Sequence, residues 1–112
     1  MNETTNFGYL GYNFQLKLMN LIITDKSFSQ SIIDVIQAKY FDNQYFKLIM
    51  QLIKEYYEKY QTSPSLDALD QLTRIEISSE MARKYVVDML KEIKDSSFED
   101  HLFIKEKSLN FC

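Results

Sequence analysis

The residues whose types could do chemistry are Glu99, Asp100 and His101, which are consecutive near the carboxyl end of the chain. An imidazole beside two carboxylates is suited to acid–base catalysis or to metal binding. However, His101 is the only histidine and Cys112 the only cysteine, so no pair of strong metal ligands occurs at the usual spacing. Neighbouring helical positions also diverge by about 100°, so the two carboxylates do not converge on one substrate. We expect His101 to be structural or solvent-facing and Glu99 to cap a helix.

Aromatic and basic side chains are a second candidate group, because rings interleaved with cations can stack on nucleic-acid bases. The tyrosines are Tyr9, Tyr12, Tyr40, Tyr45, Tyr56, Tyr57, Tyr60 and Tyr85. The cations considered are Lys54, Lys59, Arg83, Lys84, Lys91, Lys94, Lys105 and Lys107. The tyrosines stand at core spacing among Ile and Leu, and the cations alternate with acids along the sequence, which predicts core packing and solvated helix faces. The net charge of −3 also disfavours direct binding to nucleic acid.

No catalytic motif accompanies these residues. The sequence has no G-x-x-x-x-G-K-[ST] phosphate loop, no G-x-G-x-x-G fingerprint and no nucleophile elbow. We therefore expect that this chain is not an enzyme and holds no cofactor and no metal ion.

The composition predicts a single all-α domain. Of the 112 residues, 46% are hydrophobic and 26% are charged, which is typical of a globular domain. With only 2 glycines and 1 proline, the chain has few of the turn signals that β-hairpins need. No apolar run approaches the roughly 20 residues that cross a bilayer, and no secretory signal opens the chain. We expect a cytoplasmic protein that does not bind membranes.

The most informative segment is a long amphipathic helix predicted over residues 46–60. Its apolar side chains recur at steps of three and four residues from Phe46 to Tyr60, and Leu48 and Leu52 widen this face. A face this broad predicts that the helix packs against other helices on several sides, so we expect this helix to be the central element of the fold. Pro64 stops it, because a residue before proline is pushed out of helical geometry.

Shorter apolar patterns predict five further helices. They cover residues 13–23, 28–36, 65–73, 79–94 and 98–111. The expected N-caps of three of them are Ser27, Ser63 or Ser65, and Ser78 or Ser79. Ser96 and Glu99 match the S-x-x-E capping box, which predicts the start of the last helix. Ile75 and Ile77 alternate with Glu76, which we interpret as an extended loop.

The last two helices are expected to fold back on each other as an antiparallel hairpin, because the link between them is short. This divides the chain into a globular helical head, residues 1–77, and a hairpin, residues 78–112. Two helices alone bury little apolar surface, so the remaining apolar side chains of the hairpin would need a second chain. The interface candidates are Tyr85, Met89, Ile93, Phe98, Leu102 and Leu109. The last helix also lacks a C-terminal stop signal, which leads us to expect a longer natural chain.

Several packing and capping residues resemble those of a known family. They are Phe28, Tyr40-Phe41, Phe46-Lys47-Leu48-Ile49, Glu55-Tyr56, Ser63-Pro64-Ser65 with Ala68-Leu69, and Glu99-Asp100-His101 with Lys105-Glu106. In this order the chain resembles the amino-terminal domain of DnaB-like replicative DNA helicases, most closely the version of large T-even-type bacteriophages. The resemblance covers nearly the whole chain and includes no catalytic signature.

The resemblance implies a helical bundle followed by an antiparallel hairpin, with the hairpins pairing into the collar of a hexameric ring. The implied partners are further copies of the chain, the primase and the helicase loader of a primosome. ATP, Mg and DNA would be bound by a carboxy-terminal motor beyond Cys112, so this chain would serve DNA replication through oligomerisation and docking. The implied location is the cytoplasm of a bacteriophage host.

A stand-alone helical adaptor that binds one partner helix, unrelated to helicases, is the alternative. The two hypotheses differ in the coding sequence that they expect beyond Cys112. A phosphate-loop segment there would indicate the helicase, whereas a stop codon would indicate the adaptor.

Overall fold

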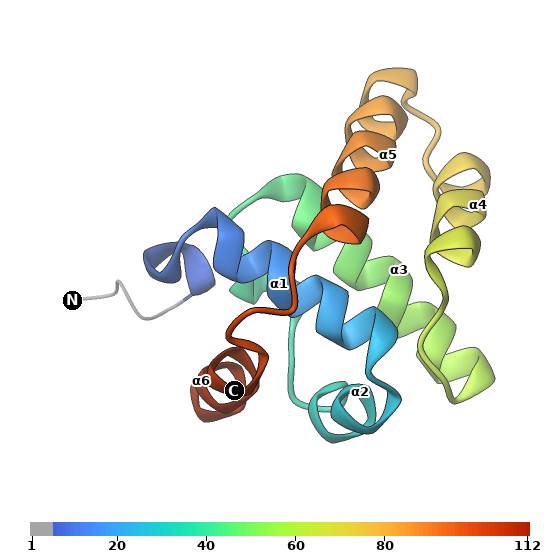
Figure 1. The fold of residues 1–112 in the computed structure, drawn as a ribbon. Helices are drawn as coiled ribbons and strands as arrows, with labels where there is room; N and C mark the ends of the chain where they lie inside the picture. Colours follow the sequence, from blue (N-terminus) through green and yellow to red (C-terminus); the bar gives the residue numbers. More distant parts are fainter. Residues whose placement is uncertain (1–5) are drawn as a thin grey trace.

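The computed structural model describes residues 6–112, and within that range the secondary structure is entirely helical (Figure 1). The elements are η1 (Phe7–Leu10), α1 (Tyr12–Thr24), α2 (Lys26–Ile32), η2 (Ala38–Tyr40), α3 (Gln44–Tyr60), α4 (Leu66–Glu76), α5 (Glu80–Asp95) and α6 (His101–Phe111). The elements η1 and η2 are short 3₁₀ helices, and the others are α-helices. The all-α prediction is confirmed for the described residues. None of these helices combines the length and apolar composition that spanning a bilayer requires.

The helix α1 occupies the centre of the fold. It contacts η1, α2, α5 and α6, whereas α3 packs against η2, α4 and α5. Nine residues of α1 are buried, compared with five of the longer α3. The prediction that residues 46–60 are helical is confirmed, but α1 is the more central helix. Its apolar residues extend around most of its circumference, which is typical of a helix enclosed by neighbours.

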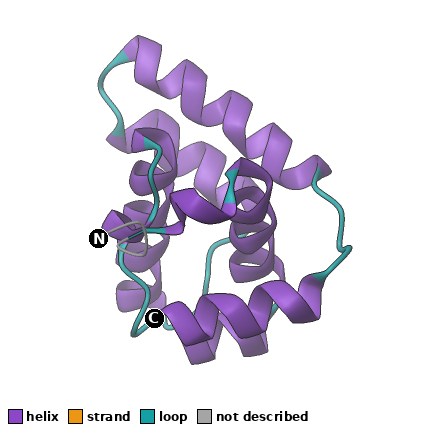
Figure 2. Cartoon of the chain, turned by 90° about the vertical axis from the view of Figure 1, so that its left-hand side faces the viewer, coloured by secondary structure: helices purple, strands orange, loops and turns teal. Residues whose placement is uncertain are grey.

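The helical hairpin of the structure is formed by α4 and α5, not by α5 and α6. The helices α4 and α5 lie side by side and are joined by a short loop (Figure 1). The last helix lies apart from α5 and packs against α1 (Figures 1 and 2). The predicted antiparallel pairing within residues 78–112 is therefore wrong, because Ile104 of α6 is buried in the core that surrounds α1.

Side-chain caps define the starts of most helices. Ser65 Oγ accepts a hydrogen bond from the Ala68 N–H at 3.1 Å, and Ser79 Oγ accepts one from the Ala82 N–H at 3.2 Å. Both caps were among the predicted alternatives. The start of α2 differs from the prediction, since its cap is Asp25 and not Ser27. The fourth helix continues to Glu76, so residues 75–76 are helical and the interpretation as an extended loop was wrong there.

The predicted capping box at the start of α6 is also absent. The hydroxyl and the backbone N–H of Ser96 both donate to the Ile93 carbonyl, at 2.7 and 3.2 Å, and so close the last turn of α5. Glu99 lies before the helix, which begins at His101. The preceding residue, Asp100, is in the left-handed region at φ 63° and makes no side-chain cap. Ser96 therefore terminates one helix and does not start the next.

Phenylalanine, not tyrosine, supplies the aromatic part of the core. The ring of Phe7 lies 5.3 Å from that of Phe41 and 4.6 Å from that of Phe111, measured between centroids. None of the eight tyrosines is fully buried. Tyr40, Tyr45 and Tyr57 are partly buried and pack against the core, so the expected core packing of the tyrosines holds only for these three and only at its edge. A hydroxyl in the core would need a partner, whereas a tyrosine at the edge keeps its hydroxyl in water.

One core joins the two predicted parts of the chain. The buried cluster includes Val86 and Ile93 of α5 and Ile104 of α6 together with residues of α1 and α3. The proposed boundary between residues 77 and 78 therefore does not separate two cores in the described structure.

Candidate functional site

The acidic and imidazole side chains at the start of α6 do not converge on one point. His101 Nδ1 lies 3.1 Å from the Phe98 carbonyl oxygen, where it is placed to donate a hydrogen bond. The Asp100 carboxylate lies 3.9 Å from Lys17 Nζ, and the Glu99 carboxylate accepts from the Ser97 hydroxyl at 3.3 Å. Within residues 6–112, no three His, Cys, Asp or Glu side chains are grouped so that they could hold a metal ion. The arrangement offers a local network and no reaction centre.

The two groups with strongly raised pKa values are equally unsuited to nucleophilic chemistry. Burial raises the pKa of the Cys112 thiol to about 11, so the thiol is protonated at neutral pH. Burial, followed by the hydrogen bond from the Tyr12 hydroxyl to Glu92 at 3.0 Å, raises the pKa of Tyr12 to about 12. Neither group would be deprotonated near pH 7.

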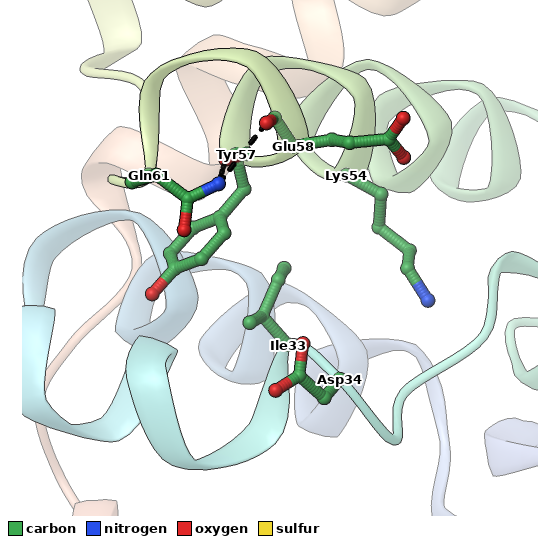
Figure 3. A pocket seen from close by; sticks show the side chains of 6 residues that line it. All are labelled: Ile33, Asp34, Lys54, Tyr57, Glu58 and Gln61. Carbon is green, nitrogen blue, oxygen red and sulfur yellow. Dashed lines mark hydrogen bonds between the residues drawn. The ribbon is translucent and has the colours of Figure 1, made fainter.

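A cavity of about 270 Å³ lies between the segment after α2 and the carboxyl end of α3 (Figure 3). Its lining residues are Ile33, Asp34, Lys54, Tyr57, Glu58 and Gln61. Gln61 Nε2 donates to the Glu58 carbonyl at 3.0 Å, and Lys54 Nζ donates to the Ile36 carbonyl. These polar side chains thus satisfy backbone carbonyls near helix ends and do not form a catalytic set.

The structure separates the six predicted interface residues into three groups. Met89 and Ile93 are 5% and 0% exposed and belong to the core, so we leave them out of the proposed interface. Tyr85 is half exposed on α5, and its ring stacks on that of Tyr45 at 5.2 Å. The remaining three lie on α6 or immediately before it.

Several exposed apolar side chains lie on the side of α6 that faces away from α1. Leu102 is 71% exposed, Phe98 61%, Phe103 51% and Leu109 39%. Leu102 and Leu109 are two helical turns apart on one side, Phe98 precedes them, and Phe103 is about 100° further round. We call these four residues the α6 outer surface.

The opposite side of α6 is held by buried contacts and one ion pair. Ile104 is buried, and the hydroxyl of Ser108, also buried, donates to the Ile104 carbonyl at 2.7 Å. Lys105 Nζ lies 2.6 Å from the Asp25 carboxylate, which lowers the pKa of Asp25, with a further contribution from the Phe28 N–H. These contacts fix which side of α6 faces solvent.

A basic groove lies between α4 and α5, and sequence analysis missed it. Five cations line two adjoining cavities of about 360 and 280 Å³. They are Arg74, Arg83, Lys84, Lys91 and Lys94. In the linear sequence these cations are interspersed with acids, but steps of three, seven and eight residues bring those of α5 to one helical face. A projection of α5 around its axis would have revealed them.

The floor of this groove is apolar. Val87 lines both cavities, and Leu66 and Leu90 line the second. The second cavity also includes two carboxylates, Asp67 and Asp70. We call the five cations, the three apolar residues and the two carboxylates the α4–α5 groove.

Among residues 6–112, the α6 outer surface and the α4–α5 groove are the two candidate sites. Both suit binding to a macromolecule, and neither has the convergent acid, base or nucleophile that catalysis needs. Comparisons of the chain with protein-family models, with curated proteins and with solved structures found no match.

Proposed function

We propose that this chain is an oligomerisation and docking domain that associates with further copies of itself through the α6 outer surface. The observation that carries the proposal is the exposure of Phe98, Leu102, Phe103 and Leu109 around a helix whose other side is fixed in the core. Apolar side chains gathered on one exposed element are typical of a surface that another chain covers.

On the resemblance of its packing and capping residues, we further propose that the parent protein is a DnaB-like replicative helicase. In that setting the domain would contribute to the collar of the ring and receive the primase and the loader. The ATP-dependent motor would be a separate part of the parent chain. This part of the proposal is supported only by the residues that carry the resemblance.

The size of the α6 outer surface predicts a weak association. Covering its four partly exposed side chains would contribute roughly 3–5 kcal/mol. The loss of translational and rotational freedom on association costs about as much or more. We therefore expect the isolated domain to associate only at micromolar concentrations or above, and a ring held by other contacts to strengthen the pairing through effective concentration.

Sedimentation velocity over a wide concentration range tests self-association directly. We expect the wild-type chain to associate as its concentration rises and Leu102→Asp to remain monomeric with an unchanged circular dichroism spectrum. Ile75→Asp is the matched control, because Ile75 is equally exposed but lies at the end of α4, away from α6. A monomeric wild-type chain at near-millimolar concentration, or the same loss in both variants, would contradict the proposal.

The coding sequence downstream of Cys112 tests the proposed parent. Continuation of the reading frame into a G-x-x-x-x-G-K-[ST] segment is the expected result. A stop codon at that point would instead favour the stand-alone adaptor, and the self-association experiment would remain informative in either case.

A further inference from the structure

We propose that the α4–α5 groove binds an acidic amphipathic helix of another protein. This site is separate from the α6 outer surface, and the inference goes beyond self-association. It depends on two properties of the groove, its charge and its apolar floor.

The charge of the groove is opposite to that of the whole chain. Its five cations outnumber its two carboxylates, which gives a local net charge of +3 on a chain whose net charge is −3. Arg74 pairs with Asp70 at 3.2 Å. The other four cations form no ion pair with any carboxylate of residues 6–112. These four ammonium and guanidinium groups are therefore available to anions of a partner.

The apolar floor indicates a protein partner in place of a nucleic acid. Leu66, Val87 and Leu90 would contact apolar side chains of a bound helix, while the cations on the rim would pair with its carboxylates. No aromatic side chain lines the groove, so bases of single-stranded nucleic acid would have no ring to stack on.

The length of the groove suits a short helix. The cations of α5 extend from Arg83 to Lys94, a distance of about 17 Å along a helix axis. A partner helix of about three turns covers that distance. Its apolar residues would recur at steps of three and four, with Glu or Asp on both flanks.

The test uses the full chain labelled with ¹⁵N and a synthetic helical peptide of about five turns, long enough to be partly helical alone. The peptide carries leucine on one face and glutamate on both flanks, and the control peptide carries glutamine in place of each glutamate. We expect saturable amide shift changes confined to α4 and α5 with the acidic peptide, and binding that weakens as salt is raised. If the glutamine peptide binds as tightly as the acidic peptide, the cations of the groove do not recognise carboxylates and the proposal is wrong.

Paired variants locate the site. Replacing both Arg83 and Lys91 with glutamine is expected to weaken binding about fivefold, because each exposed ion pair contributes modestly. The matched control is Lys39→Gln with Lys59→Gln, which removes the same charge from exposed positions outside the groove. Equal weakening in the two double variants, or shift changes centred on α6, would overturn the proposal.

A single-stranded oligothymidylate of similar charge separates the competing ligand class. We expect no shift changes in the groove with this probe. If the oligonucleotide perturbs α4 and α5 and the acidic peptide does not, the groove is a phosphate site and the proposal is wrong. Leu102→Asp should bind the peptide like the wild type, so failure of self-association and failure of groove binding can be told apart.

Discussion

Two neighbouring residues of α6 provide a sharp test of which side of this helix is buried. Ile104 is 2% exposed, whereas Leu102 is 71% exposed, although only one residue separates them. Ile104→Ala removes three carbon groups from the core, which costs about 3 kcal/mol when the remaining cavity is included. Leu102→Ala removes groups that are mostly in water already, so its cost should be below about 1 kcal/mol.

These free energies correspond to a large difference in melting temperature. For a domain of this size, 1 kcal/mol shifts the melting temperature by roughly 4 °C. We expect Ile104→Ala to lower it by about 12 °C and Leu102→Ala by less than about 4 °C. Thermal unfolding followed by circular dichroism measures both values, at a protein concentration low enough that self-association does not add to stability.

The result that would refute this reasoning is equal destabilisation by the two substitutions at low concentration. It would mean that Leu102 is buried within its own chain, and the α6 outer surface would then not exist. A loss of stability for Leu102→Ala that appears only at high concentration would instead agree with the proposed association.

Two further predictions concern contacts between helices. Because Lys105 lowers the pKa of Asp25 in the folded state, the carboxylate stabilises the fold above its unfolded pKa, and this contribution is lost as pH falls through the folded pKa. Asp25→Asn should therefore flatten the decline in melting temperature below about pH 4, and an unchanged decline would contradict the ion pair. Asn20 Nδ2 donates to the Ile93 carbonyl at 2.9 Å in the core, so Asn20→Ala should cost about 1–2 kcal/mol in urea unfolding. No change in the urea midpoint would show that this bond does not link α1 to α5.

The helices with strong periodicity could be predicted from the sequence. Residues 46–60 and 79–94 have apolar residues on one side and polar residues on the other, and both segments are helical in the structure. Ser65 and Ser79 were each predicted only as one of two possible caps, because two serines stand before each of these helices, and the structure selects the second serine in both cases.

The packing of α6 could not be predicted in the same way, because this helix has apolar residues on all sides. Leu102 and Leu109 form a near-heptad pattern with Phe98, which favoured this side as a packing seam. Ile104 and Phe111 lie on the other side, and only contacts with Phe7 and with α1 show that this side faces inward. The choice between two similar faces depends on residues distant in sequence, so no local pattern reveals it.

The α4–α5 groove was missed for a different reason. In the sequence the cations are interspersed with acids, which indicated solvated helix faces of mixed charge. In the structure the cations of α5 and Arg74 of α4 line the same groove. Helical geometry alone could have grouped the residues of α5. The contribution of Arg74 required knowledge that α4 and α5 pack together.

The bond between Asn20 and Ile93 spans 73 residues of sequence, and the central helix α1 also needs α6 to cover it. This has a consequence for folding during synthesis. While the ribosome is still adding residues before α5, α1 can pack only against η1 and α2, so the apolar side chains that α5 and α6 will cover are still exposed. The amino-terminal half of the nascent chain therefore completes its core only after α5 and α6 have been synthesised.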